Sequence, residues 1–239
     1  MTECTPSSFA FQHLGSRDVV AAFDGGRITS DAGALLLREV DLHFGFLQRF
    51  AGCFTDHRNA DRVEHSLLDL LRQRVFGLCL GYEDLNDHAA LRLDPLLATA
   101  VGKTDPLGLD RTDPADRGKP LAGKSTLNRL ELTPVGVDED SRYKKTVAHL
   151  GQIEDALIDL YLRQHATPPE RIILDLDSTD DPLHGRQLGR FFHGYYGHSC
   201  YLPLYIFAGD HPLAALLRPS NIDASAGSLG PIVSIVERL

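Results

Sequence analysis

The stretch Arg171-Ile-Ile-Leu-Asp-Leu-Asp-Ser-Thr179 decides the fold, because it has the pattern of a buried β-strand that carries two carboxylates. Its isoleucines and leucines are typical of such a strand, and Pro168-Pro169 prevents a preceding helix from continuing into it. Side chains alternate between the two faces of a strand. Asp175 and Asp177 are therefore expected on one face, with Leu174 and Leu176 on the other.

The two carboxylates of this stretch predict a compensating partner. An ionised carboxylate in a buried strand is costly to desolvate unless a cation, a basic group or backbone amides compensate it. Mg²⁺ and Mn²⁺ take oxygen ligands of this kind. The alternative is that one aspartate lies at a frayed strand end and caps the following turn. The burial argument favours Asp177 over Asp175 as the metal ligand.

Length and composition limit the classes of protein that fit. The chain has 239 residues, 43% of them apolar, which allows one large domain or two modest ones with a real core. A net charge of -9 argues against a surface coated for nucleic acid, although local basic patches fit it. Four scattered cysteines without a CxxC pair predict no disulfide framework. With no signal peptide and no membrane-spanning run, a cytoplasmic location is expected.

Helical patterns come first along the chain, and strand patterns follow. A strand and an Asp-Gly-Gly turn are expected within residues 18–28. Apolar periodicity and capping residues then predict helices at 34–46, 63–80, 85–97 (a helix pair), 125–132 and 143–162, with a loop at 102–120 and Ser125 or Thr126 as a helix cap. After 171–179, aromatic runs and glycine-rich turns predict successive antiparallel strands up to residue 217, and a helix begins near 232.

Two motifs suggest other functions on less support. Gly118-Lys-Pro-Leu-Ala-Gly-Lys-Ser125 matches the phosphate-binding loop letter for letter, but no strand precedes it and Pro120 lacks an amide donor. A polar loop before a helix fits better. His184, His193, His198 and Cys200 could suggest zinc, but the paired ligand spacing of a structural zinc site is absent. Ser178 beside two carboxylates is a poor nucleophile.

An acid-bearing strand followed by antiparallel strands is the start of a ribonuclease H-like arrangement, in which a central strand supplies one ligand of a two-metal site. Several blocks occur in a matching order, and with them the chain resembles the DDE transposases of bacterial insertion sequences, specifically the thirteen-eighty group. These blocks are residues 28–37, residues 62–87 with their helical leucine pattern and Gly81-Tyr-Glu-Asp-Leu-Asn86, Ser125-Thr-Leu-Asn-Arg-Leu-Glu131, Leu174-Asp-Leu-Asp-Ser-Thr-Asp-Asp-Pro-Leu-His-Gly-Arg-Gln187, Tyr201-Leu-Pro-Leu204 and Leu217-Arg-Pro-Ser-Asn221.

The resemblance implies a catalytic role for the opening stretch. Asp177 corresponds to the first acid of the Asp-Asp-Glu triad and to a ligand of Mg²⁺ or Mn²⁺, with Asp175 as the rival placement. The second acid of the family lies in a later Arg-x-Asp-Ser-Gly-Phe type block, and its glutamate lies further on; neither occurs in these 239 residues. Asp210 and Asp223 do not match that block. A truncated, catalytically incomplete transposase is therefore expected.

The resemblance also implies DNA as the partner, namely the terminal repeats of the element, together with a second copy of the chain or an intact transposase. The candidate DNA-binding residues are Lys124, Ser125, Thr126, Asn128, Arg129, Arg62, Arg72 and Arg74. For each arginine, a solvated helix face is the alternative. The expected fold is α+β: a mainly helical DNA-binding region at 1–165, then the first half of a ribonuclease H-like α/β domain with an incomplete sheet at 166–239. The expected location is the cytoplasm, in association with the nucleoid. A non-catalytic DNA-binding remnant that competes for element ends is the alternative function, and a nucleotide-binding protein using Gly118–Ser125 is a further one.

Overall fold

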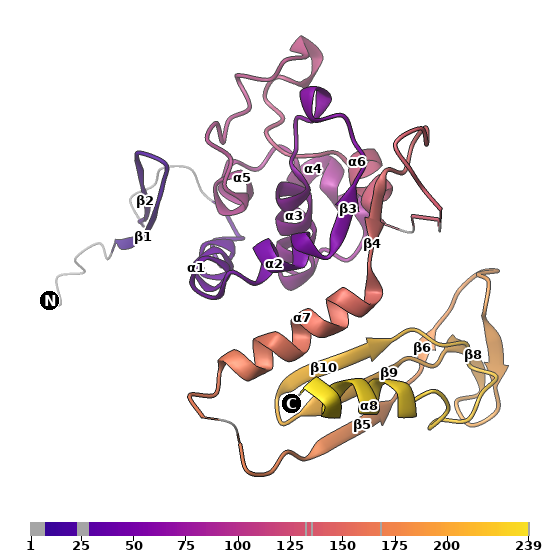
Figure 1. The fold of residues 1–239 in the computed structure, drawn as a ribbon. Helices are drawn as coiled ribbons and strands as arrows, with labels where there is room; N and C mark the ends of the chain where they lie inside the picture. The colour runs from indigo at the N-terminus through magenta and orange to yellow at the C-terminus, as the bar shows by residue number, and fades with distance from the viewer. Residues whose placement is uncertain (1–7, 23–28, 132, 135, 168, 239) are drawn as a thin grey trace, which may run out of the picture. The chain divides into compact units, whose positions relative to one another are not determined.

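The computed structural model describes residues 8–22, 29–131, 133–134, 136–167 and 169–238. These residues form a mixed α+β structure, as expected, in two compact units, Met1–Ala148 and His149–Leu239 (Figure 1). The predicted turn at 24–26 and Pro168 lie outside the described residues. None of the helices in the described ranges has both the length and the apolar character needed to cross a membrane.

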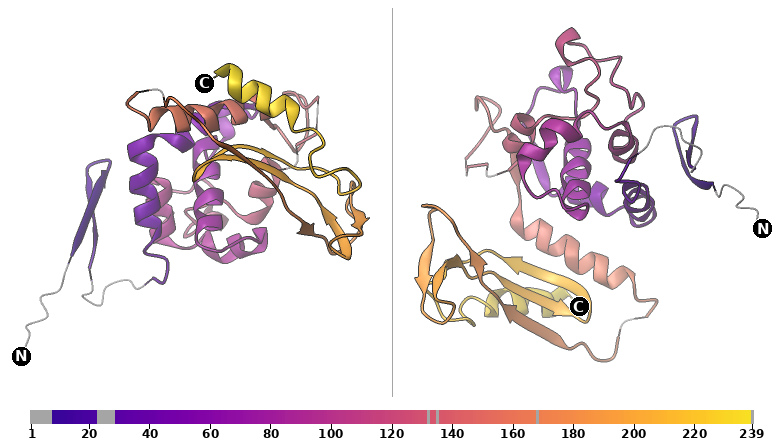
Figure 2. Two further views of the ribbon diagram at one scale, coloured as in Figure 1. Left: turned by 90° about the horizontal axis from the view of Figure 1, so that it is seen from below. Right: turned by 180° about the vertical axis from the view of Figure 1, so that it is seen from behind.

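The N-terminal unit is mainly helical (Figures 1 and 2). Its helices are α1 (Ala34–Phe44), α2 (Phe46–Gly52), α3 (Leu67–Cys79), α4 (His88–Leu91), α5 (Pro95–Val101) and α6 (Lys124–Leu130), with the 3-10 turns η1 (Ala60–Arg62), η2 (Leu85–Asp87) and η3 (Pro114–Asp116). Its strands form two antiparallel pairs, β1 (Phe9–Leu14) with β2 (Arg17–Ala21) and β3 (Phe54–Asp56) with β4 (Thr146–Ala148).

Local sequence signals set the helix ends in this unit. Ser66 and Asp69 form a reciprocal capping box at the start of α3. Asp94 caps α5, which has Pro95 in its first turn, where the missing amide hydrogen is tolerated. Gly45 adopts a left-handed conformation (φ 63°) between α1 and α2, so the single helix expected at 34–46 ends there.

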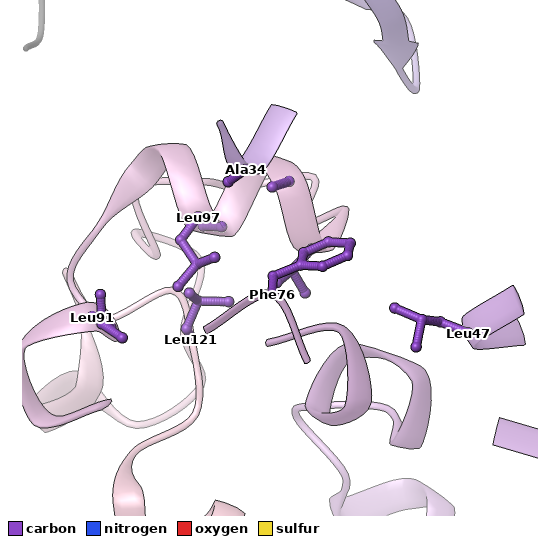
Figure 3. Packing of buried hydrophobic residues seen from close by; sticks show 9 residues of the cluster. Ala34, Leu47, Phe76, Leu91, Leu97 and Leu121 are labelled. Atoms are coloured by element: carbon purple, nitrogen blue, oxygen red, sulfur yellow. The ribbon is translucent and has the colours of Figure 1, made fainter. Parts of the chain in front are cut away.

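The core of the N-terminal unit lies between α1, α2, α3, α4 and α5. Figure 3 shows part of this core, in which the labelled residues are Ala34, Leu47, Phe76, Leu91, Leu97 and Leu121. A neighbouring cluster joins α3 to α6 through Leu70, Leu71, Leu127 and Leu130. The apolar periodicity of 63–80 correctly predicted that Leu70 and Leu71 are buried in α3, but Leu78 is exposed, and the buried Gln73 and Phe76 were not part of that pattern.

Two predicted helix starts are wrong, and strand β1 of the N-terminal unit was not predicted. The helix expected from residue 143 begins at Leu150, because residues 146–148 pair with β3 as β4. Helix α6 begins at Lys124 with Gly123 as its N-cap, so Ser125 and Thr126 lie inside the helix and do not cap it. Strand β1, which the sequence pattern did not predict, pairs with the expected strand β2.

The C-terminal unit contains the acid-bearing stretch 171–179, part of which forms strand β5. Its elements are α7 (Leu150–Arg163), β5 (Leu174–Ser178), β6 (Asp181–Pro182), β7 (Phe191–His193), β8 (His198–Tyr201), β9 (Leu204–Ala208), β10 (His211–Leu216) and α8 (Leu229–Arg238). One antiparallel sheet has the order β10-β9-β5, and a second has the order β6-β8-β7. The predicted succession of antiparallel strands is therefore confirmed.

Both helices of this unit contribute to the apolar core on one face of the β10-β9-β5 sheet. Ile158 and Tyr161 of α7 and Ile235 of α8 share a buried cluster with Leu204 and Ile206 of β9, and the left view of Figure 2 shows α7 and α8 on the same side of the strands. In this register Leu174 is opposite Ala208, and Leu176 is opposite Ile206. This face of β5 therefore points to the core.

The two units do not divide where the functional regions were expected to divide. Helix α7 packs against β10, so it belongs to the C-terminal unit, whereas the predicted boundary at 165/166 assigned it to the DNA-binding region. The functional division into residues 1–165 and 166–239 stays a prediction.

Candidate carboxylate site and nucleic-acid interface

Asp175 and Asp177 lie on the face of β5 that is opposite the apolar core. In the antiparallel register Asp175 is opposite Phe207, and Asp177 is opposite Tyr205. The expectation of a buried strand is wrong: both aspartates are exposed, and even Leu176 is 42% exposed. The reason is that, in the described part of the chain, β5 pairs on one side only and is an edge strand. Burial therefore imposes no need for a compensating partner, and both carboxylates are accessible to a metal ion from solvent.

The end of β5 and the residues after it are held by Tyr196 of the turn after β7, by His198 of β8 and by Arg218 after β10. Tyr196 donates its hydroxyl to the carbonyl of Ser178 at 3.4 Å, and His198 Nε2 lies 2.6 Å from Asp180 Oδ2. Burial, and then the negative charge of Asp180, raise the pKa of Tyr196, so its hydroxyl stays protonated as a donor. The buried Arg218 donates to Ser178 Oγ as well. The residue after Asp177 is therefore held by both a backbone and a side-chain contact.

The donor chemistry of this face suits a hard divalent cation. Mg²⁺ is commonly held by one or two carboxylates together with water and substrate phosphates, and Asp177 and Asp175 supply carboxylates accessible from solvent. Among the residues that the structure describes, no group of three or more histidine, cysteine, aspartate or glutamate side chains could enclose a metal ion. These residues fit a partial, open site rather than a closed one.

The residues predicted on the polar face of α6 line a hollow of about 590 Å³. The exposed side chains of Lys124, Ser125, Asn128 and Arg129 contribute to it, and their contact with a phosphate backbone stays a prediction. The remaining lining residues, which the sequence reasoning did not select, are Asp84, Leu85, Asn86, Tyr143 and Lys144. Lys124 Nζ donates to Asn86 Oδ1 at 2.8 Å, which joins the start of α6 to η2. We call this surface the α6 hollow.

Tyr143 is the aromatic residue of the α6 hollow, and two guanidinium groups lie against its ring. The Cζ atoms of Arg129 and Arg142 are 5.8 Å and 4.9 Å from the ring centroid. The run Arg142-Tyr-Lys-Lys145 carried the signal that would have found these residues, namely basic side chains next to an aromatic one. This signal was missed because the apolar periodicity of residues 143–162 predicted that the run belongs to a helix.

The four remaining DNA-binding candidates lie elsewhere. Arg62 is exposed at the end of η1, and Thr126 is partly buried in α6. Arg72 donates from Nε to Asp41 Oδ2 at 2.8 Å, and Arg74 donates from Nε to Glu131 Oε1 at 2.6 Å. Arg72 and Arg74 are largely buried in these ion pairs, so they are placed to connect α3 with its neighbours rather than to meet a ligand.

Four amides in the first part of loop 118–125 donate inside the protein. The N–H groups of Gly118, Lys119 and Leu121 donate to the carbonyls of Gly108, Asp116 and Arg92, at 2.9, 3.1 and 3.3 Å. Ala122 N–H donates to Gln73 Oε1 at 3.0 Å, and residue 120 is a proline. A phosphate-binding loop needs converging free amides after a strand, and here the 3-10 turn η3 precedes the loop. These hydrogen bonds and the turn before the loop do not support nucleotide binding by Gly118–Ser125.

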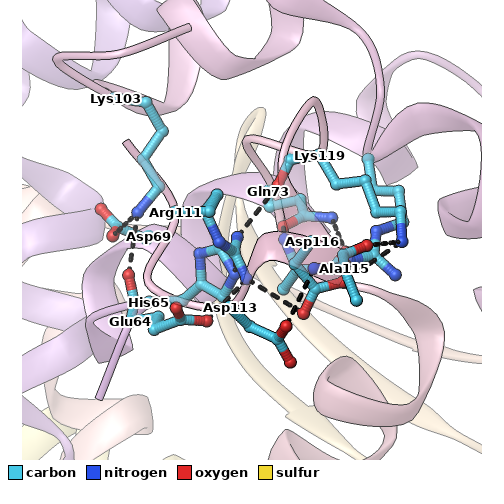
Figure 4. Close-up of polar contacts among 12 residues, drawn as sticks. Glu64, His65, Asp69, Gln73, Lys103, Arg111, Asp113, Ala115, Asp116 and Lys119 are labelled. Carbon is cyan, nitrogen blue, oxygen red and sulfur yellow. Dashed lines mark hydrogen bonds and ion pairs between the residues drawn. The ribbon is translucent and has the colours of Figure 1, made fainter. Parts of the chain in front are cut away.

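A polar cluster around Arg111 lies beside this loop (Figure 4). Arg111 Nη1 is 2.9 Å from His65 Nε2, and Arg111 Nη2 is 2.6 Å from Glu64 Oε2. Asp116 accepts from Arg92 at 3.0 Å. Burial, followed by the positive charges of Lys103 and Arg111, lowers the pKa of His65 to about 3. His65 is therefore a neutral acceptor at physiological pH, and the cluster connects the long loop to the start of α3.

The positions of His193, His198 and Cys200 do not support a zinc site. His198 is committed to Asp180, and Cys200 is buried in β8. The sheet β6-β8-β7 brings His193 opposite His198 in register, but the described residues do not form a metal-holding group around them. These histidines belong to the hairpin of β7 and β8.

An open sheet face with paired carboxylates and a separate basic hollow are features of proteins that act on nucleic acid with divalent cations. The comparison with known families narrows this class: residues 11–239 match the family described as Transposase DDE domain group 1. Because the match covers most of the chain, the protein belongs to this family of DDE transposases. The search of curated proteins and the search of solved structures both returned no match. Membership implies DNA as the substrate and divalent metal ions as the general cofactor of the family.

The blocks that carry the resemblance contact one another within each unit. Tyr82 donates to Asp31 Oδ2 at 3.0 Å, and Arg74 joins Glu131 to the carbonyls of Tyr82 and Glu83. In the C-terminal unit, Arg218 contacts Ser178 across 40 positions of sequence. Segments that are far apart in sequence therefore form shared scaffolds around α6 and β5. The assignment to the thirteen-eighty group stays a prediction.

Proposed function

We propose that this protein is a DDE-type transposase that takes part in metal-dependent cleavage and transfer of DNA strands at insertion-sequence ends. The observation that carries the proposal is the position of Asp177, together with Asp175, on the open face of β5. Support also comes from the order β10-β9-β5, in which antiparallel strands follow the acid-bearing strand β5, and from the family match.

In this proposal Asp177 is the metal ligand, and its neighbours position it. When bound, a divalent cation supplies charge stabilisation at the attacking and leaving oxygens of the phosphodiester. Asp177 would hold such an ion from the exposed strand face, and Asp175 is the rival or second ligand on the same face. Arg218 and Tyr196 fix the backbone and side chain of Ser178, so the adjacent carboxylate has a defined direction.

We further propose that residues 1–239 alone do not complete the catalytic triad. The sequence contains no Arg-x-Asp-Ser-Gly-Phe type block. Asp210 lies in the turn between β9 and β10, and Asp223 accepts hydrogen bonds from the amide and hydroxyl of Ser225. Neither residue is a substitute for the second acid. A single-acid site holds a cation weakly, and strand cleavage by this chain alone should be undetectable.

The test is a Mn²⁺ titration followed by paramagnetic resonance, with a parallel nicking assay on DNA. Asp177→Asn should weaken Mn²⁺ binding severalfold, whereas Asp181→Asn, an exposed aspartate of β6, should not change it. If the two substitutions change Mn²⁺ binding equally, Asp177 is not the metal ligand. Robust nicking that depends on Asp177 would show that the chain is catalytically complete and would contradict the incompleteness.

A second candidate function is a non-catalytic DNA-binding protein that competes with intact transposase for element ends. The α6 hollow favours it, because this basic surface lies in the N-terminal unit and the carboxylates of β5 lie in the other. A salt-sensitive gel shift with element-end DNA that survives Asp177→Ala supports this function. If the unaltered chain does not bind DNA in low salt, this DNA-binding function is excluded.

A further inference from the structure

We propose that the α6 hollow binds an unpaired nucleotide of DNA, with the base stacked on Tyr143 and the adjoining phosphates held by Arg129 and Arg142. This inference rests on the proposed function to the extent that DNA is the ligand. It goes beyond that function by naming the ligand of the hollow: the exposed face of an unpaired base, and not regular double-stranded DNA.

The first support is the exposure of an aromatic ring inside a basic hollow. The Tyr143 side chain is 58% exposed although two guanidinium groups lie against it. A cation–π contact at an exposed site contributes about 0.5–1 kcal/mol, whereas stacking of a base on an aromatic side chain contributes about 1–3 kcal/mol. A base can therefore replace one guanidinium on the ring, and the released arginine is then free to meet the phosphate beside that base.

The second support is the distribution of charge around the ring. Lys124, Arg129 and Lys144 line the hollow, against the single lining carboxylate of Asp84. The hydrogen bond from the Asn86 amide, followed by that from the Asn86 side chain, lowers the pKa of Asp84, so it stays charged and disfavours a phosphate at its own side. In a chain of net charge -9, such a local excess of cations favours a polyanion along the α6 side of the hollow.

The third support is the shape of the hollow and the length of α6. Inside a continuous duplex each base face is covered by its neighbours, whereas an unpaired base can present a free face to Tyr143. Helix α6 has 7 residues and would span about 10 Å at 1.5 Å per residue. Such a short helix contacts few base pairs in a groove, whereas a volume of about 590 Å³ lies within the general range for small-molecule sites, roughly 300–1,000 Å³.

The test compares the full chain on two labelled DNAs in the presence of EDTA: a blunt duplex, and the same duplex with a short single-stranded overhang containing 2-aminopurine. Affinity is measured by anisotropy, and stacking by quenching of the 2-aminopurine fluorescence. Tyr143→Leu, which keeps apolar bulk without a π-face, should weaken overhang binding roughly 5- to 150-fold and abolish the quenching. Tyr143→Phe should retain both. Tyr195→Ala, at a tyrosine that is 86% exposed in the other unit, is the matched control and should change neither.

The outcomes separate this inference from the proposed function. If the unaltered chain binds neither DNA in low salt, the proposed DNA-binding function fails. If it binds both DNAs and Tyr143→Leu weakens them equally or not at all, only the unpaired-nucleotide assignment is overturned. Tighter binding of an RNA overhang of the same sequence would overturn DNA as the ligand. Because Tyr143 is exposed, Tyr143→Leu should keep the thermal stability of the unaltered chain, and a large loss would be checked against the Tyr143→Phe result.

Discussion

Arg218 is the buried residue that joins the strand of Asp177 to the later part of the C-terminal unit. It is 7% exposed and donates to the carbonyls of Leu202, Ala224 and Ala226 as well as to Ser178 Oγ. Since a guanidinium offers five donors in a fixed planar arrangement, one side chain can satisfy several acceptors. The position selects arginine for geometry rather than for charge alone.

Replacing Arg218 should therefore destabilise the fold more than removal of a surface charge would. Arg218→Ala removes the donor to the buried carbonyl of Leu202 and to the carbonyls of Ala224 and Ala226, and it should lower the free energy of unfolding by roughly 2–4 kcal/mol, measured by urea denaturation. Arg218→Lys should recover only part of this, because an ammonium cannot reach acceptors spread around the guanidinium plane. The exposed Arg186→Ala is the control and should have almost no effect. A loss of the same size in both variants would contradict the structural role of Arg218.

His65 makes stability dependent on pH in a defined window. It is 7% exposed, and its pKa falls from 6.5 to about 3 in the folded protein. Between these values the unfolded chain binds a proton that the folded chain does not, so stability is lost as the pH falls below about 6.5. Burial lowers the pKa of His88 too, which adds a contribution of the same sign.

His65→Gln should reduce this dependence, since glutamine can still accept from Arg111 but does not titrate. Between pH 6 and pH 5 the unaltered chain should lose about 1 kcal/mol more stability than the variant, because one proton corresponds to about 1.4 kcal/mol per pH unit. Urea melts at these two pH values measure the difference. Identical slopes for the two proteins would mean that His65 is protonated in the folded state.

At the scale of elements, α6 depends on its buried face to present the exposed one. Leu127 is fully buried and packs with Leu70, Leu71 and Leu130. Leu127→Ala should lower the free energy of unfolding by roughly 2–5 kcal/mol and weaken DNA binding, because the side chains of Lys124 and Arg129 lose a fixed base. Leu93→Ala, at an exposed leucine of the same unit, is the matched control for both measurements. If Leu127→Ala is clearly destabilised but binds DNA with full affinity, α6 is not part of the DNA-binding surface.

The sequence predicted elements well where one element carries its own pattern. Apolar spacing of 3.6 residues located α3 and α7, and the glycine-punctuated aromatic runs located β7 to β9. Strands β3 and β4, of three residues each, were missed because their pairing joins residues about 90 positions apart, and no local signal encodes such a partner. The burial of β5 was mispredicted for a related reason. An apolar strand is buried only if strands or helices cover it, and that depends on the rest of the sheet.

In the candidate sites too, the sequence predicted what depends on neighbouring residues and missed what depends on residues far along the chain. Residue type and spacing correctly placed Asp175 and Asp177 on one face and put Lys124, Asn128 and Arg129 on the exposed side of a helix. The sequence could not show that Arg72 and Arg74 are used by Asp41 and Glu131, or that Tyr143 lies beside α6, because these contacts depend on tertiary packing.

At the scale of the whole molecule, charge limits how DNA can be bound. The chain carries -9 overall, so a phosphate backbone is repelled from most of its surface and attracted at few places. The α6 hollow gathers Lys124, Arg129 and Lys144, and Arg142 lies against Tyr143. Contacts to about four phosphates are the expected number, and this number determines the response of binding to salt.

The salt dependence of DNA binding is therefore a test of the whole charge distribution. With about four phosphate contacts, the logarithm of affinity should fall with the logarithm of salt concentration with a slope of about -3.6. Raising the salt from 50 to 200 mM should then weaken binding roughly 100-fold. Replacing Arg129 and Arg142 together by glutamine should flatten the slope by about 1.8, because each lost contact removes about 0.9. Arg186→Gln removes one positive charge at an exposed position of the other unit and should leave the slope unchanged. A slope far steeper than -4, or one that the double substitution does not change, would place the main DNA-binding surface outside the α6 hollow.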